Sequence, residues 1–272
     1  MTAQDIFQTL EHVDDQTAGV IIERLEMRGR DEDFVAMRDR YIERLELGPT
    51  AQVLELGCGT GVVSRALAAK SGFQGEVVGS DFSAALIDAA RSLAHDEGVD
   101  ARTRFVVEDA QSTHQPDDNY DAVILHTLVS HVPDPAAAIN EAARTVKPDH
   151  HVAVFDGDYA SLGLFTGRDD DDAVVEAILG AVVANPTVMR AMPTLLNNAC
   201  LTVTDVQSSI RVEIGELTFF RSLAESYVPI AVRSNLLDAS RADDWLKSLR
   251  AACENGTAFA SCNYLTYIAT RG

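Results

Sequence analysis

The sequence has few basic residues and no long apolar run. Among its 272 residues, 22 Lys and Arg stand against 42 Asp and Glu, which gives a net charge of −20. A surface of this charge repels phosphate backbones and anionic lipid, so we expect neither nucleic acid nor a membrane surface as a partner. No apolar run approaches the ~20 residues of a membrane-spanning helix. The opening residues MTAQDIFQTLEHVDDQ are acidic and polar, unlike a signal peptide.

Paired cysteines and metal-ligand patterns are also lacking. Cys58, Cys200, Cys253 and Cys262 form no CxxC pair, and their spacings fit no zinc site. We therefore expect reduced thiols, a cytoplasmic protein and no metal ion. The acidic run RDDDDA, which begins at Arg168, is interpreted as a solvated loop and helix start, because acids are favoured near the positive end of a helix.

The sequence does contain a regular alternation of short strands and helices. The first 48 residues have helical spacing that ends at Gly48-Pro49, and the alternation begins after them. It predicts right-handed βαβ units, a parallel sheet and a ligand crevice at the carboxyl ends of the strands. The predicted helices are GVVSRALAAKSG, SAALIDAARSLAHDEG with Ser83 as its N-cap, and PAAAINEAARTVKP. The predicted strands are AQVLELG, EVVGSD, TRFVVED, YDAVILH and HVAVFDGD.

After residue 160 the pattern becomes helical through about Asn198. LTVTDVQSSIRVEI and CNYLTYIAT then indicate two late strands, which would extend the sheet at one edge. The helices between them and those at the N-terminus would cap the crevice. The sequence thus predicts an α/β fold with an N-terminal helical cap (1–48), a ligand-binding core (49–160), and helical cap segments with closing sheet strands (161–272).

The stretch VLELGCGTG, residues 53–61, places three alternating glycines between a predicted strand and a predicted helix. Glycine allows a ligand to approach the backbone closely, and the start of a helix presents free N–H groups. A nicotinamide dinucleotide would use such a turn for its pyrophosphate, but its fingerprint is GxGxxG, whereas this turn has GxGxG. The glycines alone are a weak signal, and a plain strand–helix turn would account for them.

Carboxylates at successive strand ends narrow the range of ligands that the site could bind. Asp81 ends the next strand, 20 residues after Gly61, where it can accept hydrogen bonds from a ribose diol. Asp109 ends the third strand and can accept one from an adenine amino group, while Glu55 lies two residues before the first glycine of the turn. No basic residue lies in the turn to meet a phosphate. A ligand with ribose, adenine and a positive centre fits these acids, although Asp81 would also suit a helix cap and Asp109 a solvated turn.

This set resembles the class I methyltransferases that use S-adenosylmethionine, over roughly residues 41–160. The resemblance implies a Rossmann-like, seven-stranded, mostly parallel sheet with helices on both faces. It also implies that Glu55 organises the turn, that Asp81 binds the ribose, and that the backbone at His126 lies beside the methionine part of the cofactor. Tyr41 is expected to reach the cofactor carboxylate or to be a core residue. The implied cofactor-binding residues are Tyr41, Glu55, Gly57, Cys58, Gly59, Gly61, Asp81, Phe82, Asp109, Ala110 and His126.

The catalytic candidates follow the fourth and fifth strands, in HTLVSHVPDP and FDGDYAS. His131 is a candidate general base for a hydroxyl, an amine or a ring nitrogen, and the alternative is that it only shapes the loop. Asp156 and Asp158 are candidates for substrate contact, for orienting a cation or for holding a loop turn. The residues expected to contact the substrate are Arg38, Thr127, His131 and Tyr159.

The phrases HTLVSHVPDP and VFDGDY resemble a bacterial group of small-molecule methyltransferases, which includes ubiquinone, menaquinone and natural-product enzymes. The chain departs from this group at KPDHHV, residues 147–152, where a proline-glycine-glycine turn is usual. We therefore expect methyl transfer from S-adenosylmethionine to an oxygen, nitrogen or carbon atom of a small-molecule acceptor. The alternatives are a protein of this fold that binds the cofactor without transferring its methyl group, and a nicotinamide oxidoreductase. The sequence leaves both a monomer and a homodimer as alternatives.

Overall fold

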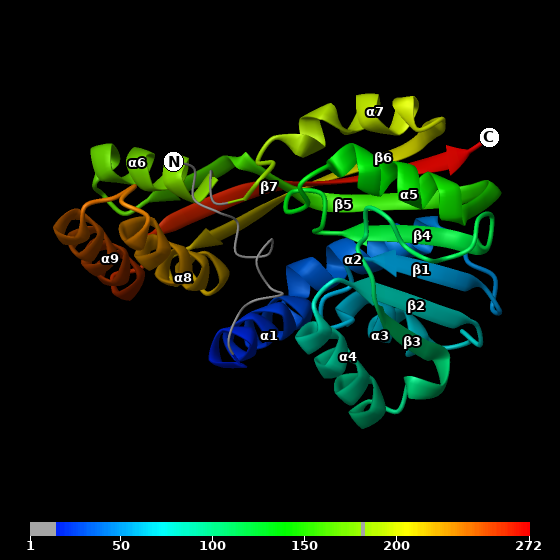
Figure 1. Cartoon of the computed structure of the whole chain (residues 1–272). Helices are drawn as coiled ribbons and strands as arrows, with labels where there is room; N and C mark the ends of the chain where they lie inside the picture. The colour runs from blue at the N-terminus through cyan, green and yellow to red at the C-terminus, as the bar shows by residue number, and fades with distance from the viewer. Residues whose placement is uncertain (1–14, 181–182) are drawn as a thin grey trace.

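The computed structural model describes residues 15–180 and 183–272 (Figure 1). The predicted helical segment 1–48 is helical from Asp15 onward, and its first 14 residues lie outside the described ranges. In those ranges no helix is long and apolar enough to cross a bilayer.

The strands are β1 (Gln52–Leu56), β2 (Glu76–Asp81), β3 (Thr103–Val107), β4 (Tyr120–His126), β5 (Val146–Phe165), β6 (Leu201–Ile214) and β7 (Phe259–Arg271). The helices are α1 (Asp15–Arg30), α2 (Glu32–Arg44), α3 (Val62–Ala68), α4 (Ala84–Asp96), the short η2 (Asp100–Arg102), α5 (Pro135–Thr145), α6 (Asp169–Gly180), α7 (Val188–Asn198), α8 (Phe219–Arg233) and α9 (Ala239–Glu254).

The strands form one seven-stranded sheet in the order β3-β2-β1-β4-β5-β7-β6. The pairs from β3 through β5 are parallel, and β7 is antiparallel to both of its neighbours. The predicted mostly parallel seven-stranded sheet is confirmed, and the two late strands extend one edge as expected. The strand order reverses between β1 and β4, which is where an open α/β sheet binds its ligand.

Successive side chains of the central strands point to opposite faces of the sheet, and they form an apolar layer on each face. In β4, Ile124 packs in one buried cluster with Ile87 of α4, and Leu125 packs in another with Ile139 of α5 and Met192 of α7. Figure 1 shows α5 and α7 on one side of the sheet and α3 and α4 on the other. Both faces are therefore covered, as a parallel sheet requires.

Strand β5 is longer than the sequence suggested. The predicted return to helix is confirmed by α6 and by α7, which ends at Asn198. It begins at Asp169 and not after residue 160, because residues 163–165 still pair with Ser261–Phe259 of β7. The extended ends of β5, β6 and β7 project past the other strands, and α6, α8 and α9 gather at that end (Figure 1). The proposed boundary at residue 160 falls inside this strand, and the division into three segments stays a prediction.

The unusual KPDHHV segment forms a bulge at the start of β5. Tyr120 pairs with Val146 and Ala122 with His151, so the residues between are extra in β5. Asp149 has φ of +63°, a left-handed conformation for which a glycine is the usual choice. The bulge thus takes the place of a proline-glycine-glycine turn.

Candidate functional site

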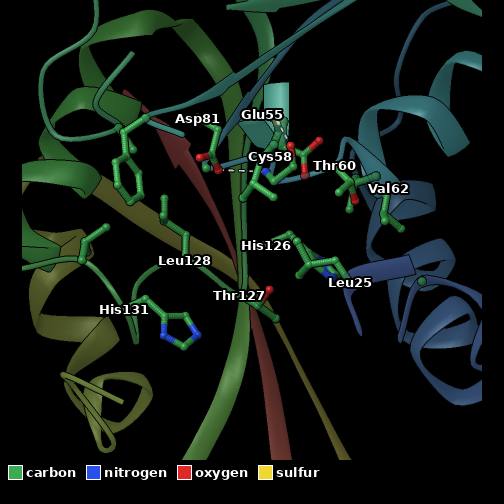
Figure 2. Close-up of a pocket in the computed structure, with 18 of the residues that line it drawn as sticks. Leu25, Glu55, Cys58, Thr60, Val62, Asp81, His126, Thr127, Leu128 and His131 are labelled. Carbon is green, nitrogen blue, oxygen red and sulfur yellow. Dashed lines mark hydrogen bonds between the residues drawn. The ribbon is translucent and has the colours of Figure 1, made fainter. Parts of the chain in front are cut away.

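A cavity of about 290 Å³ lies at the carboxyl ends of β1, β2 and β4 (Figure 2). The glycine turn, the ends of these strands and the loop after β3 line it, together with residues of α1 and α2. Figure 2 shows Glu55, Cys58 and Asp81 at one end and His131 at the other. The crevice that the strand–helix alternation predicted is therefore present.

Each glycine of the turn has a positive φ, of +68°, +55° and +76° in chain order. A Cβ atom on Gly57 would lie 2.3 Å from Leu128 Cδ1, and one on Gly61 2.6 Å from the Phe105 ring. A Cβ atom on Gly59 would meet Leu25 of α1 at 3.1 Å. Glycine is thus required both by the backbone conformation and by the neighbours.

Glu55, near the end of β1, joins this strand to α3, which follows the glycine turn. Its Oε2 accepts hydrogen bonds from the backbone N–H of Ser64 (2.9 Å) and from Ser64 Oγ (2.5 Å) in α3. Burial raises the pKa of Glu55 to about 7, against the hydrogen bonds from Ser64 that lower it. Burial also raises the pKa of the adjacent Cys58 thiol well above its usual range, so this cysteine is a packing residue and not a thiolate nucleophile.

Asp81 ends β2 with both carboxylate oxygens in use. Oδ2 accepts from the N–H of Gly59 (2.9 Å) and Oδ1 from the N–H of Ser83 (2.9 Å). Ser83 caps α4 as predicted, accepting from the N–H of Leu86. Each carboxylate oxygen has a second lone pair, so Asp81 ties β2 to the glycine turn and keeps capacity for a ribose diol.

The loop after β3 supplies the far wall of the cavity. Asp109 is exposed and accepts from both the backbone N–H (2.9 Å) and the side-chain amide of Gln111. Ala110 is buried, and Phe82 contributes a half-buried ring to the same wall. A flat ring with an amino group would meet an apolar face and an acceptor here.

His126 belongs to an aromatic stack beneath the cavity. Its ring stacks on Phe155 at 4.6 Å, and its Nδ1 lies 2.9 Å from Tyr41 Oη. Burial, then the charges of Arg28 and Arg38, hold the pKa of His126 well below its usual range, so the ring is neutral at pH 7. Tyr41 is fully buried, and it is not among the residues that line the cavity. The structure thus places it in the core, which was one of its two expected places.

Thr127, directly after β4, has φ of +52°, a strained conformation for a β-branched residue. Its N–H donates to the carbonyl of Phe155 (2.7 Å), and its Oγ1 accepts from Arg28 Nη2 of α1 (2.6 Å). Strain of this kind collects at binding sites, where the surroundings hold it in place. Both Thr127 and Arg38 line the cavity, and their contact with a substrate stays a prediction.

Helix α1 closes over the glycine turn. Glu26 accepts from Thr60 Oγ1 (2.6 Å) and from Arg65 Nη2 (2.6 Å), and a Cβ atom on Gly29 would lie 2.6 Å from Val62. Glu26 and Arg28 are residues of the site that the sequence did not predict. Helical spacing predicted the helix, but nothing in the sequence shows which residues it lays against the turn.

His131 lies at a junction, because it lines both the main cavity and a second one of about 30 Å³. Asp156 lies behind it, fully buried, and accepts from the N–H groups of Ser130 (3.0 Å) and Gly157 (2.8 Å). Burial raises the pKa of Asp156, and the nearby charge of His131 opposes that rise. Tyr159 lines the second cavity, with its ring 6.3 Å from that of His131.

Two further predictions are placed away from this site. Asp158 forms an ion pair with Arg190 and lines neither cavity. The interpretation of the acidic run as solvated is wrong for Asp172, which is buried and accepts from Trp245 Nε1 (2.7 Å) and from the N–H of Thr166 (2.8 Å). No acidic, histidine or cysteine cluster within residues 15–180 and 183–272 is arranged to hold a metal ion.

Comparison with known proteins agrees with this geometry. Residues 53–149 match the family described as a methyltransferase domain. The methyltransferase GfsG of Streptomyces halstedii is 31% identical over 120 residues, which cover 44% of this chain and 42% of that protein. The ubiquinone biosynthesis O-methyltransferase of Alkalilimnicola ehrlichii is 36% identical over 102 residues, covering 37% of this chain and 39% of that protein. The chain thus spans about four tenths of the length of these curated relatives.

Among solved structures, the (4+2)-cyclase SpnF superposes with a TM-score of 0.57 at 18% identity, over 89% of this chain and 84% of that one. At this identity the likeness shows the fold alone. The family match and the shared fold confirm the resemblance that the glycine turn and its acids indicated.

Proposed function

We propose that this chain, whose residues 53–149 belong to the class I S-adenosylmethionine-dependent methyltransferases, transfers a methyl group to a small-molecule acceptor. One observation carries the proposal. The glycine turn, carboxylates at successive strand ends and His131 all open on a single cavity. Carboxylates at the strand ends beside the turn suit a ligand with a ribose and a cationic centre, and they would repel a diphosphate.

The cofactor would be held by residues already in place. Asp81 would accept from the ribose, Asp109 and Ala110 would meet the adenine, and the glycine turn would receive the methionine part. Arg28 and Arg38 also line the cavity and suit the cofactor carboxylate. When bound there, the cofactor supplies an activated methyl group on a sulfonium.

The protein's own contribution to methyl transfer is to orient the acceptor, to exclude water and to accept one proton from the acceptor. We assign His131 as the base that takes a proton from a hydroxyl or amine acceptor, because it lies at the junction of the two cavities. Asp156 is positioned to orient the ring and to stabilise the imidazolium that would form. An acceptor that is already ionised would not need this base.

The direct test is transfer of label from methyl-tritiated S-adenosylmethionine to a low-molecular-mass cell extract. The proposal predicts labelled small molecules with the wild-type chain and loss of labelling in Asp81→Asn. Asp88→Asn is the matched control, because the Asp88 side chain is 73% exposed on α4. Cofactor binding without any labelled product would favour the non-methylating alternative, which the fold shared with a cyclase keeps open.

The net charge of −20 supports a small molecule over nucleic acid as the partner. A cytoplasmic location and a homodimer remain part of the proposal. Size-exclusion chromatography with light scattering tests the second.

A further inference from the structure

The second cavity lies between α1, α6, α8 and the end of β5. Its walls are mainly apolar and aromatic, with Leu179, Phe219 and Tyr227 buried and Tyr159 half-buried. At about 30 Å³ it holds roughly one water molecule in this closed arrangement. It meets the main cavity, because Leu25, Arg28 and His131 line both. A molecule in the second cavity would therefore reach the proposed base from the side opposite the glycine turn.

Two guanidinium groups stand in these apolar walls. Arg24 and Arg28 lie one turn apart on α1, and both line the second cavity. No carboxylate of the described residues lies within 4.0 Å of either guanidinium. Of the described arginines, the two that are buried are paired with acids, Arg65 with Glu26 and Arg211 with Asp31.

The Arg24 guanidinium instead lies over the Tyr227 ring of α8, with its Cζ atom 4.5 Å from the ring centroid. This contact joins α1 to α8 across the mouth of the cavity. In a chain with 42 acidic and 22 basic residues, an arginine that faces an aromatic pocket instead of an acid keeps its strongest donors for another group. An anionic ligand would bind these donors while its apolar body replaced the contact with Tyr227.

We propose that the second cavity is the acceptor site and that it selects an aromatic or otherwise apolar acceptor carrying an anionic group, which Arg24 binds. The inference rests on the proposed function, because it names the acceptor of that same reaction. The apolar body packs against Tyr159, Phe219 and Tyr227, and the nucleophilic atom faces His131. Because the cavity is small, α1 and α8 separate to admit the acceptor.

The test uses two fluorescent probes that share an anilinonaphthalene body. 8-Anilinonaphthalene-1-sulfonate carries an anion, and N-phenyl-1-naphthylamine is neutral. Both are titrated into the full chain with saturating S-adenosylhomocysteine, which occupies the main cavity. Arg24→Gln removes the charge, Arg24→Lys restores it, and Arg30→Gln removes a charge from the exposed end of the same helix, where the side chain is 78% exposed.

We expect the sulfonate to bind the wild type, and its affinity to fall about tenfold in Arg24→Gln because a charge-assisted hydrogen bond is lost. Arg24→Lys should recover part of that loss, and Arg30→Gln should bind like the wild type. Affinity for the neutral probe should be equal in all four proteins. Equal sulfonate affinity in Arg24→Gln and Arg30→Gln, or no binding to the wild type, would overturn the anion site.

Isothermal titration with S-adenosylhomocysteine in each variant separates this failure from failure of the proposed function. A wild type that fails to bind S-adenosylhomocysteine refutes the cofactor site, and the probes are then titrated alone. A wild type that binds it, with a sulfonate affinity insensitive to Arg24, refutes only the acceptor class.

Discussion

Replacing Glu55 with glutamine should stabilise the protein, by an amount that depends on pH. The pKa of Glu55 rises from 4.5 to about 7, chiefly because the carboxylate is buried. The folded state thus favours the neutral acid, and this stabilising contribution is fully present below pH 4.5 and lost as pH rises through 7. The difference between the two pKa values corresponds to about 3 kcal/mol. Glutamine mimics the neutral acid at every pH and keeps an acceptor for Ser64.

The assay is urea unfolding of the wild type and Glu55→Gln at pH 5 and pH 8 without cofactor. We expect Glu55→Gln to be more stable than the wild type by less than about 1 kcal/mol at pH 5 and by about 3 kcal/mol at pH 8. The contributions of the other titrating groups to the free energy of unfolding cancel in the difference between the two proteins, since both proteins share those groups.

Glu141→Gln is a control of opposite sign. Burial raises the pKa of Glu141, but hydrogen bonds from Arg144 and Thr113 outweigh burial, so the net pKa is lowered. Its stabilising contribution is present above its unfolded pKa, so Glu141→Gln should destabilise the protein at pH 8. A difference between Glu55→Gln and wild type that stays constant from pH 5 to 8 would show that folding does not raise the pKa of Glu55. A carboxylate kept at the end of β1 at this cost is typical of a site selected for binding.

Three other changes should have separate effects. Gly57→Ala places a Cβ atom 2.3 Å from Leu128 Cδ1 at φ of +68°, and should lower the free energy of unfolding by about 1–3 kcal/mol, measured in urea, and weaken cofactor binding. Asp81→Asn should weaken S-adenosylhomocysteine binding by roughly tenfold or more in calorimetry, because one N–H of the turn and the ribose lose a charged acceptor. Trp245→Phe should cost about 1–3 kcal/mol in urea unfolding, because the buried Asp172 loses its indole donor, with no change in cofactor affinity. Unchanged stability in the last variant would contradict the role given to that bond.

The sheet and the glycine turn could be predicted because their signals are local. The strand LTVTDVQSSIRVEI matches β6, Leu201–Ile214, residue for residue. Asp81 and Asp109 stand at strand ends, and parallel strands bring their carboxyl ends to one edge, so periodicity alone places both acids near the glycines.

The remaining features depend on contacts between distant segments. The last residues of β5 form a strand because β7 pairs with them, and their own sequence did not show it. Asp172 is buried because Trp245, 73 residues away, donates to it. The contacts of Arg28 with Thr127 and of Arg24 with Tyr227 arise from how α1 lies over the turn and against α8. No local pattern shows these placements, so the walls of the second cavity could not be predicted.

The cofactor site is tested most directly by isothermal titration of the purified chain with S-adenosylhomocysteine, run beside NAD. We predict saturable binding of S-adenosylhomocysteine with one site per chain, weakened in Gly57→Ala, and no binding of NAD. Binding of NAD alone, or of neither ligand, would mean that the glycine turn and its acids are architecture only, and would contradict the methyltransferase assignment.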